Sequence, residues 1–298
     1  MTRVWVAALL LRRLRAERGV LAILFVLIAA TAFAFSAGPR LFNRVADAGL
    51  AYAMQSALPI QRDLTLALSY SIPPGSDGGV AALEAYGQRQ EATFPADVER
   101  QIAGRSLHVS LTRLLLTDPP LGPTHLVLRY QDGMTDATRL VAGRWPVGRG
   151  MPLAPSSGND QAPPAVVEVA FSSFEADQLG VKIGDRFGIS PDASDPLART
   201  VIGPSDLFGS GRHDLAPAVI EVVGLFEPVD PGAPDWAGDG GLLQATVTGI
   251  DPPFTYYATA FVAAAAYPDL AGSQLLFRYE WHYRIDPQLD AGQAVALG

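Results

Sequence analysis

Nineteen consecutive residues without a charge, 19–37, lie close to the N-terminus and read GVLAILFVLIAATAFAFSA. At about 1.5 Å rise per residue, a helix of this length spans roughly 28 Å, close to the hydrocarbon thickness of a bilayer. No other stretch of the chain is both as long and as apolar. We therefore expect a transmembrane helix over residues 19–37.

Arginines on the two flanks of this stretch predict its orientation. Four precede it and two follow it closely, namely Arg12, Arg13, Arg15 and Arg18, then Arg40 and Arg44. Since the more basic flank stays in the cytoplasm, we expect residues 1–18 inside the cell and residues 38–298 outside it, with the chain in the plasma (inner) membrane. Residues 4–14 are either a short helix lying on anionic membrane lipid or only a basic topology signal.

Two other interpretations of residues 19–37 are compatible with the sequence. A cleaved signal peptide needs an A-x-A site, which Ala32, Phe33 and Ala34 supply. Against it, the eighteen preceding residues are long for a signal peptide, and the bulky Phe35 follows the site. A core helix of a soluble protein fits poorly, because the stretch has no polar face. A retained anchor is the preferred interpretation.

Charge is distributed unevenly along the chain. The first 44 residues carry seven arginines and one acidic residue, whereas the remainder has an excess of fourteen acidic groups, which leaves a net charge of −8. An acidic surface repels phosphate backbones, so we expect no nucleic-acid partner. The chain has no cysteine, which excludes disulfides, thiolate metal ligands and a thiol nucleophile.

The part beyond the anchor mixes strand and helix signals without a regular alternation, which is typical of an α+β fold. A helical extension is expected over residues 38–60, which are rich in helix formers and limited by Pro59. Residues 61–298 are expected to form an extracytoplasmic domain around a mixed sheet. The loop-like segments 146–164 and 191–217 suggest that a β-rich sub-domain is inserted into it. Strands are expected over 63–70, 106–116, 124–130, 165–171, 185–189, 219–226, 259–263 and 274–285, and helices over 77–104 and 174–179.

Four segments of this part occur in an order that resembles a known family. They are LVAGRWP at 140–146, VVEVAFSSFEADQLGVKIGDRFGIS at 166–190, VIEVVGLFEPVDPGAPDWAGD at 219–239 and YEWHYRIDPQLD at 279–290. Placed after a single anchor, the set resembles the extracytoplasmic domain, the MacB-like periplasmic core domain, of FtsX/MacB-like ABC transporter permeases.

The resemblance implies a permease subunit with two kinds of protein partner, a cytoplasmic ABC ATPase and a second permease in a homo- or heterodimer. ATP hydrolysis by the ATPase would be coupled to movement of the outer domain, for export or mechanotransmission. Permeases of this family continue with three more membrane helices. We therefore expect this sequence to be the N-terminal part of such a permease, with a single-anchor relative as the alternative.

Sequence motifs for chemistry are absent. No G-x-x-x-x-G-K-[ST] loop occurs, the glycine-rich segment 203–211 lacks a lysine, and the only lysine is Lys182. No G-x-S-x-G motif and no helical H-x-x-x-H pair occur. We therefore expect no enzyme, no cofactor and no metal site. His108, His125, His213 and His282 are expected to be packed or surface residues, and Asp230, Asp235 and Asp239 to be turn residues rather than calcium ligands.

Aromatic residues in and near one Pro/Gly-rich loop are candidates for contact with a partner. Trp236 lies in this loop, and Phe254, Tyr256 and Tyr257 follow it. The rings either form an exposed contact patch or pack onto the sheet. The alternative function from another class is a single-anchor extracytoplasmic binding module that captures a ligand or a protein. A hydrolase lacks a recognisable catalytic set.

Overall fold

The structure is a computed structural model that describes residues 18–57, 59–70, 79–154, 163–192, 194–195, 215–233, 236, 240–273 and 275–286. The chain divides into two compact units, one that contains the N-terminal helix and one that spans Ala57–Asp286. Several expectations fall outside the described residues, namely those for residues 4–14, the segment 203–211, His213, Asp235 and Asp239.

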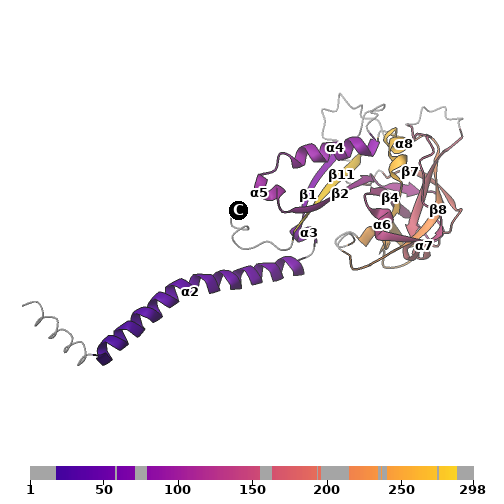
Figure 1. Ribbon diagram of the computed structural model, residues 1–298. Helices are drawn as coiled ribbons and strands as arrows, with labels where there is room; N and C mark the ends of the chain where they lie inside the picture. The colour runs from indigo at the N-terminus through magenta and orange to yellow at the C-terminus, as the bar shows by residue number, and fades with distance from the viewer. Residues whose placement is uncertain are drawn as a thin grey trace, which may run out of the picture. The chain divides into compact units, whose positions relative to one another are not determined.

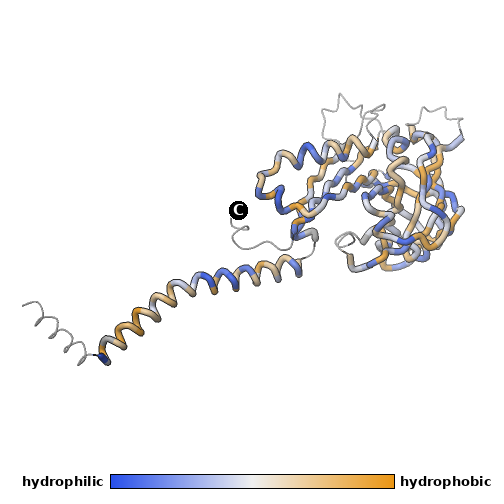
Figure 2. Tube along the Cα trace, viewed as in Figure 1, coloured by the Kyte–Doolittle hydropathy of each residue, from blue (hydrophilic) through white to orange (hydrophobic). Residues whose placement is uncertain are grey.

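Helix α2 contains the whole apolar stretch and continues well beyond it. It spans Arg18–Ser56, 39 residues, and is long and apolar enough to cross a membrane. At 1.5 Å per residue it is about 58 Å long, roughly twice the hydrocarbon thickness of a bilayer. Figure 2 shows a strongly hydrophobic first half and a mixed second half. Residues 38–56 of the helical extension expected over 38–60 therefore belong to the same helix, which contains Pro39. Pro59 begins the separate short helix α3.

The large apolar side chains that the structure describes in residues 19–37 are exposed, whereas those of a core helix would be buried. Phe25 is 73% exposed and Phe33 is 71% exposed. Apolar surface of this extent is stable only in contact with another apolar phase, and a bilayer supplies one.

The second unit is built on one mixed sheet, in which the described residues form eleven strands. Most neighbouring strands are antiparallel, whereas the pairs β6–β8 and β4–β10 are parallel. The strands are β1 Leu64–Tyr70, β2 Ile102–Leu111, β3 Leu114–Leu116, β4 Thr124–Gln131, β5 Thr138–Gly143, β6 Ala165–Ser172, β7 Arg186–Pro191, β8 Ala218–Pro228, β9 Thr246–Thr248, β10 Thr255–Phe261 and β11 Phe277–Ile285. The short helices are α3 Pro59–Arg62, α4 Gly79–Glu91, α5 Ala96–Glu99, α6 Met134–Ala137, α7 Ser173–Leu179, α8 Tyr267–Ala271 and the 3-10 turns η3 Gly240–Leu242 and η4 Ala264–Ala266. The α+β fold class expected from the sequence is confirmed.

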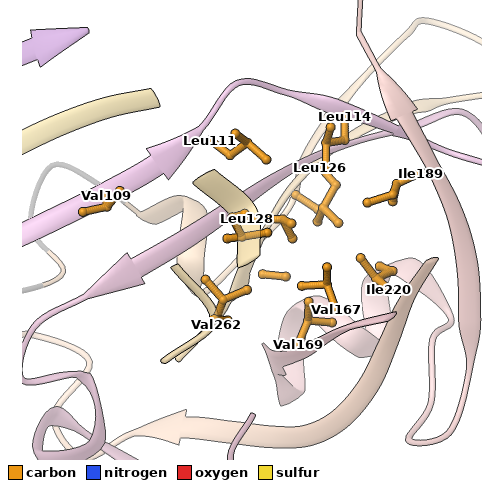
Figure 3. Packing of buried hydrophobic residues seen from close by; sticks show 14 of the residues in the cluster. Val109, Leu111, Leu114, Leu126, Leu128, Val167, Val169, Ile189, Ile220 and Val262 are labelled. Carbon is orange, nitrogen blue, oxygen red and sulfur yellow. The ribbon is translucent and has the colours of Figure 1, made fainter. Parts of the chain in front are cut away.

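Six of the strands form a closed circuit. Strand pairings lead from β4 through β3, β7, β8, β6 and β10 back to β4. Figure 3 shows apolar side chains from these strands pointing toward one another inside the circuit. Leu126, Val169 and Ile220 are 0% exposed there. Each such burial contributes about 1.5–3 kcal/mol, so this core is a principal source of stability.

The circuit has a gap between β6 and β10 that a side chain from α7 fills. These strands pair only at Phe261 and Ala170. Beside the gap, the backbone N–H of Thr259 donates to Oε1 of Glu175 at 2.9 Å. Glu175 is fully buried, and burial raises its pKa well above the ordinary value, which favours the neutral carboxyl. The helix is positioned by its N-cap, Ser172, whose hydroxyl accepts from the Glu175 N–H.

Strands β1, β11 and β2 continue the sheet away from the circuit, and one face of β11 carries a row of buried rings. Phe277, Tyr279, Trp281 and Tyr283 alternate along β11 and are at most 1% exposed. Helix α4 lies over them (Figure 1), and its Leu83 carbonyl accepts a hydrogen bond from Trp281 Nε1 at 3.1 Å. The other face of β11 therefore carries its polar residues.

One strand and one helix expected from the sequence have other bounds in the structure. The strand expected over 106–116 is divided into β2 and β3. The helix expected over 77–104 is two short helices, α4 and α5, and residues 102–104 belong to β2. Pairing of Ile102 with Ile285 and of Gly104 with Arg284 holds this segment extended. Strand β5, which was not expected, pairs with β8 and ends at Gly143, whose φ of +73° requires glycine.

Candidate functional site

The polar face of β11 meets polar residues of both neighbouring strands. In the sheet register, Glu280 lies opposite His108 of β2, and His282 lies opposite Thr65 of β1. One strand further, Arg129 of β4 lies opposite Ser110 of β2. Residues paired across antiparallel strands share a face, so these side chains converge on the face opposite the buried rings.

Three of these residues, His108, Glu280 and His282, form what we call the His–Glu cluster. The two imidazole rings lie 4.2 Å apart between centroids. His282 Nε2 lies 3.8 Å from Glu280 Oε2. One nitrogen or oxygen of each residue lies within 4.8 Å of the others. The buried His282 Nε2 has no hydrogen-bond partner, since 3.8 Å exceeds a hydrogen bond.

Two arginines flank the His–Glu cluster. Arg129, which is 5% exposed, donates from Nη2 to His108 Nδ1 at 2.6 Å. Arg278 donates from Nε to Glu280 Oε1 at 2.8 Å. Because Nδ1 of His108 is an acceptor, its ring proton is on Nε2 when the ring is neutral.

The ionisation of the cluster follows from burial and these charges. Burial, followed by Arg129 and His282, lowers the pKa of His108 to about 2, so the ring is neutral. His282, followed by Arg278, lowers the pKa of Glu280 to about 2 against the effect of burial, so the carboxylate is charged. Burial lowers the pKa of Arg129 to about 10, which leaves the guanidinium charged at neutral pH.

The cluster is poorly suited to nucleophilic catalysis. Ser106 Oγ lies 3.5 Å from His108 Nε2. A serine triad needs a basic imidazole whose other nitrogen donates to a carboxylate. In His108 that nitrogen instead accepts from Arg129, and the lowered pKa of the ring makes it a weak base. Two imidazoles and a carboxylate are, however, a donor set that transition-metal ions use.

A second polar cluster surrounds His125 of β4. His125 Nδ1 and Asp192 Oδ2 are 2.7 Å apart, and the His125 ring stacks on Tyr257 with centroids 4.7 Å apart. The Arg113 guanidinium lies over the same tyrosine ring, 5.4 Å from its centroid. Asp192 also accepts from Ser194, and these contacts hold the pKa of Asp192 below its ordinary value despite burial.

A third cluster holds the segment after β5 against the sheet. Glu168 of β6 is 2% exposed and accepts from Arg144, from Arg149 and from the Val147 N–H. The hydrogen bond from Arg144 is the largest of the effects that lower the pKa of Glu168 to about 2. All contacts of this carboxylate are internal, which indicates a structural role.

The four residues expected to contact a partner are not all at the surface. Trp236 is 4% exposed and Tyr256 is 9% exposed, so both rings pack in the core. Phe254 and Tyr257 are half-buried, and Tyr257 is the one that joins the charged cluster around His125. Partner contact by these residues stays a prediction, with Phe254 and Tyr257 as its accessible members.

Sequence spacing did not predict the His–Glu cluster. Glu280 and His282 are two residues apart, which places them on one face of a strand, whereas the H-x-x-x-H pattern that was sought is a helical spacing. This E-x-H spacing on an alternating strand was the available signal. The third member, His108, is brought in by the register of β2 on β11, which the sequence does not reveal.

The similarity of this chain to known proteins is weak. The chain matches no known family model and no curated protein. Among solved structures, a domain of a candidate permease from Porphyromonas gingivalis aligns over 79% of each chain, with 12% identity and a TM-score of 0.27. At that score a common fold is not established. The chain belongs to the class of proteins in which a helix able to cross a membrane is followed by a large mixed-sheet α+β domain.

Proposed function

We propose that this chain is a membrane-anchored permease subunit of an ABC transporter, or the N-terminal part of one. Helix α2 anchors it, and the mixed-sheet unit Ala57–Asp286 faces the outside of the cell. A separate cytoplasmic ATPase hydrolyses ATP, and this chain converts that free energy into movement of its outer domain. The resemblance of its ordered sequence segments to FtsX/MacB-like permeases motivates the assignment.

The observation that carries the proposal is the continuity of α2. The helix needs only its first half to cross the hydrocarbon region and continues as helix to Ser56. A helix keeps its length under load because every interior residue adds a backbone hydrogen bond. Such an extension transmits a displacement from the membrane toward the domain, whereas a passive tether needs no helix.

Two further observations support a retained anchor with an outward domain. The helix passes through Ala32, Phe33 and Ala34, the segment that a signal peptidase would have to cleave, without a break. The arginine-rich flank precedes the helix, and the acidic remainder follows it.

The proposal is tested on the chain purified in mild detergent from its native membranes. We expect vanadate-sensitive ATP hydrolysis to accompany it, and ATP to change the rate at which trypsin cleaves the outer domain. Inserting Gly-Gly-Ser-Gly after Gly49 should remove this change, because a flexible segment breaks the helix.

A matched insertion of Ala-Ala-Lys-Ala at the same place serves as the control, since it adds about one helical turn. It should keep the response to ATP. Absence of any copurifying ATPase, or an equal response in both insertions, contradicts the proposal. If no ATPase copurifies and the chain is still found in the membrane, the result favours the anchored binding module instead.

A further inference from the structure

We propose that the His–Glu cluster binds a divalent transition-metal ion of the Zn²⁺ class, and that Arg129 occupies its place when the metal is absent. The proposal concerns residues His108, Glu280 and His282 and does not depend on the function of the chain in the membrane. Nothing in the sequence motifs assigns this site.

The first observation is the donor set. Two imidazole nitrogens and one carboxylate oxygen lie within 4.8 Å of one another on adjacent strands β2 and β11. Zinc ions accept such a set with a water as the fourth ligand, whereas Ca²⁺ and Mg²⁺ require oxygen ligands. Ligand atoms around tetrahedral zinc are about 3.3 Å apart, so a small rotation of the side chains suffices. His282, whose side chain is 34% exposed, has room for that rotation.

The second observation is the buried nitrogen of His282. Its Nε2 has no hydrogen-bond partner and faces Glu280 Oε2 at 3.8 Å. Buried polar atoms are nearly always paired, so this unpaired nitrogen, which faces the Glu280 carboxylate, is a position where a bound ion or a water would supply the missing partner. The other oxygen of Glu280 is held by Arg278, and the other nitrogen of His282 lies 3.3 Å from Thr65 Oγ1. These contacts orient both side chains, as outer-shell groups do in metal sites.

Arg129 determines when a metal can bind. Its Nη2 donates to Nδ1 of His108 at 2.6 Å. If the metal binds Nδ1, the lone pair that accepts this hydrogen bond is used; if the metal binds Nε2, Nδ1 carries the proton and cannot accept. Either way the Arg129 hydrogen bond must break. A metal ion and the guanidinium are therefore competing cations at one site, and replacing the guanidinium should strengthen metal binding.

The experiment uses the tag-free full chain in detergent, stripped with EDTA and titrated with ZnCl₂ in a calorimeter. We expect one Zn²⁺ per chain in the wild type. His282→Ala should weaken binding at least about tenfold, as the loss of a ligand does. Arg129→Gln should strengthen binding about tenfold through the loss of the competing cation. Co²⁺ in place of Zn²⁺ should give the d–d absorption of a site with nitrogen ligands.

The controls are His125→Gln, which lies on the same strand as Arg129 but is paired with Asp192, and His213→Ala. Both should bind Zn²⁺ as the wild type does. The proposal is overturned if the wild type does not bind, if His282→Ala binds equally well, or if a control loses binding. Glu280→Gln gives a second ligand variant, with the same expected loss, should His282→Ala fail to fold.

Discussion

The core has room for no side chain larger than hydrogen at Gly87 of helix α4. A Cβ at this position would lie 2.4 Å from Cδ1 of Trp281. The indole cannot retreat, because it is 0% exposed and its Nε1 donates to the Leu83 carbonyl. Helix propensity favours alanine over glycine by about 1 kcal/mol, whereas overpacking a core costs about 1–3 kcal/mol. With the indole fixed, we expect the steric cost to win.

Gly87→Ala should therefore lower the free energy of unfolding by about 1–2 kcal/mol, the steric cost less the gain in helix propensity. Urea denaturation of the full chain in detergent, followed by tryptophan fluorescence, measures this directly. Gln88→Ala on the same helix is the matched control, since Gln88 is exposed and should change stability by less than about 0.5 kcal/mol. Equal stability of Gly87→Ala and the wild type would contradict the packing of α4 on Trp281.

Glu168 makes the stability of the domain depend on pH. Arg144 and the other donors lower its pKa from 4.5 to about 2 in the folded chain. A carboxyl with a lowered folded pKa stabilises the fold above its unfolded pKa, and this contribution is lost as the pH falls from 4.5 through about 2. The contribution at neutral pH is on the order of 3 kcal/mol.

Glu168→Gln should thus lower the free energy of unfolding at pH 7 and flatten its decline between pH 4.5 and 2. Urea denaturation at a series of pH values gives both quantities. Glu227→Gln, which removes an exposed pair with Arg139, is the control and should cost less than about 1 kcal/mol. An unchanged pH profile for Glu168→Gln would show that the carboxylate does not hold residues 144–149.

At the scale of elements, the sequence predicted what local physics determines. The strand signal over 274–285 located β11, and the helix signal over 174–179 located α7, whose first residue is Ser173. The uncharged stretch located the apolar half of α2. Each of these patterns depends only on residues close together in the chain.

The same patterns could not predict what depends on distant pairing. Residues 102–104 favoured helix locally and became strand because Ile285 and Arg284 pair with them. Closure of the circuit by β4 and β10 joins residues more than a hundred positions apart. The His–Glu cluster depends on one register, since shifting β2 by one residue would move His108 to the opposite face.

At the scale of the whole molecule, charge and hydropathy describe one topology. Seven arginines precede residue 45, and the remainder has an excess of fourteen acidic groups. Along the sequence, helix α2, with its apolar first half, follows the most basic segment and precedes the acidic unit. Because basic flanks are retained in the cytoplasm, this order of charge and apolar length predicts that the mixed-sheet unit lies outside.

The absence of cysteine makes this topology directly measurable. Single cysteines are introduced at Thr2 and at Thr248, an exposed residue of β9, and right-side-out membrane vesicles are treated with a membrane-impermeant maleimide. Labelling of Thr248→Cys in intact vesicles, and of Thr2→Cys only after detergent is added, is the predicted result. Labelling of Thr2→Cys but not Thr248→Cys in intact vesicles, or recovery of the chain in the soluble fraction without residues 1–34, would contradict an anchored outward-facing domain.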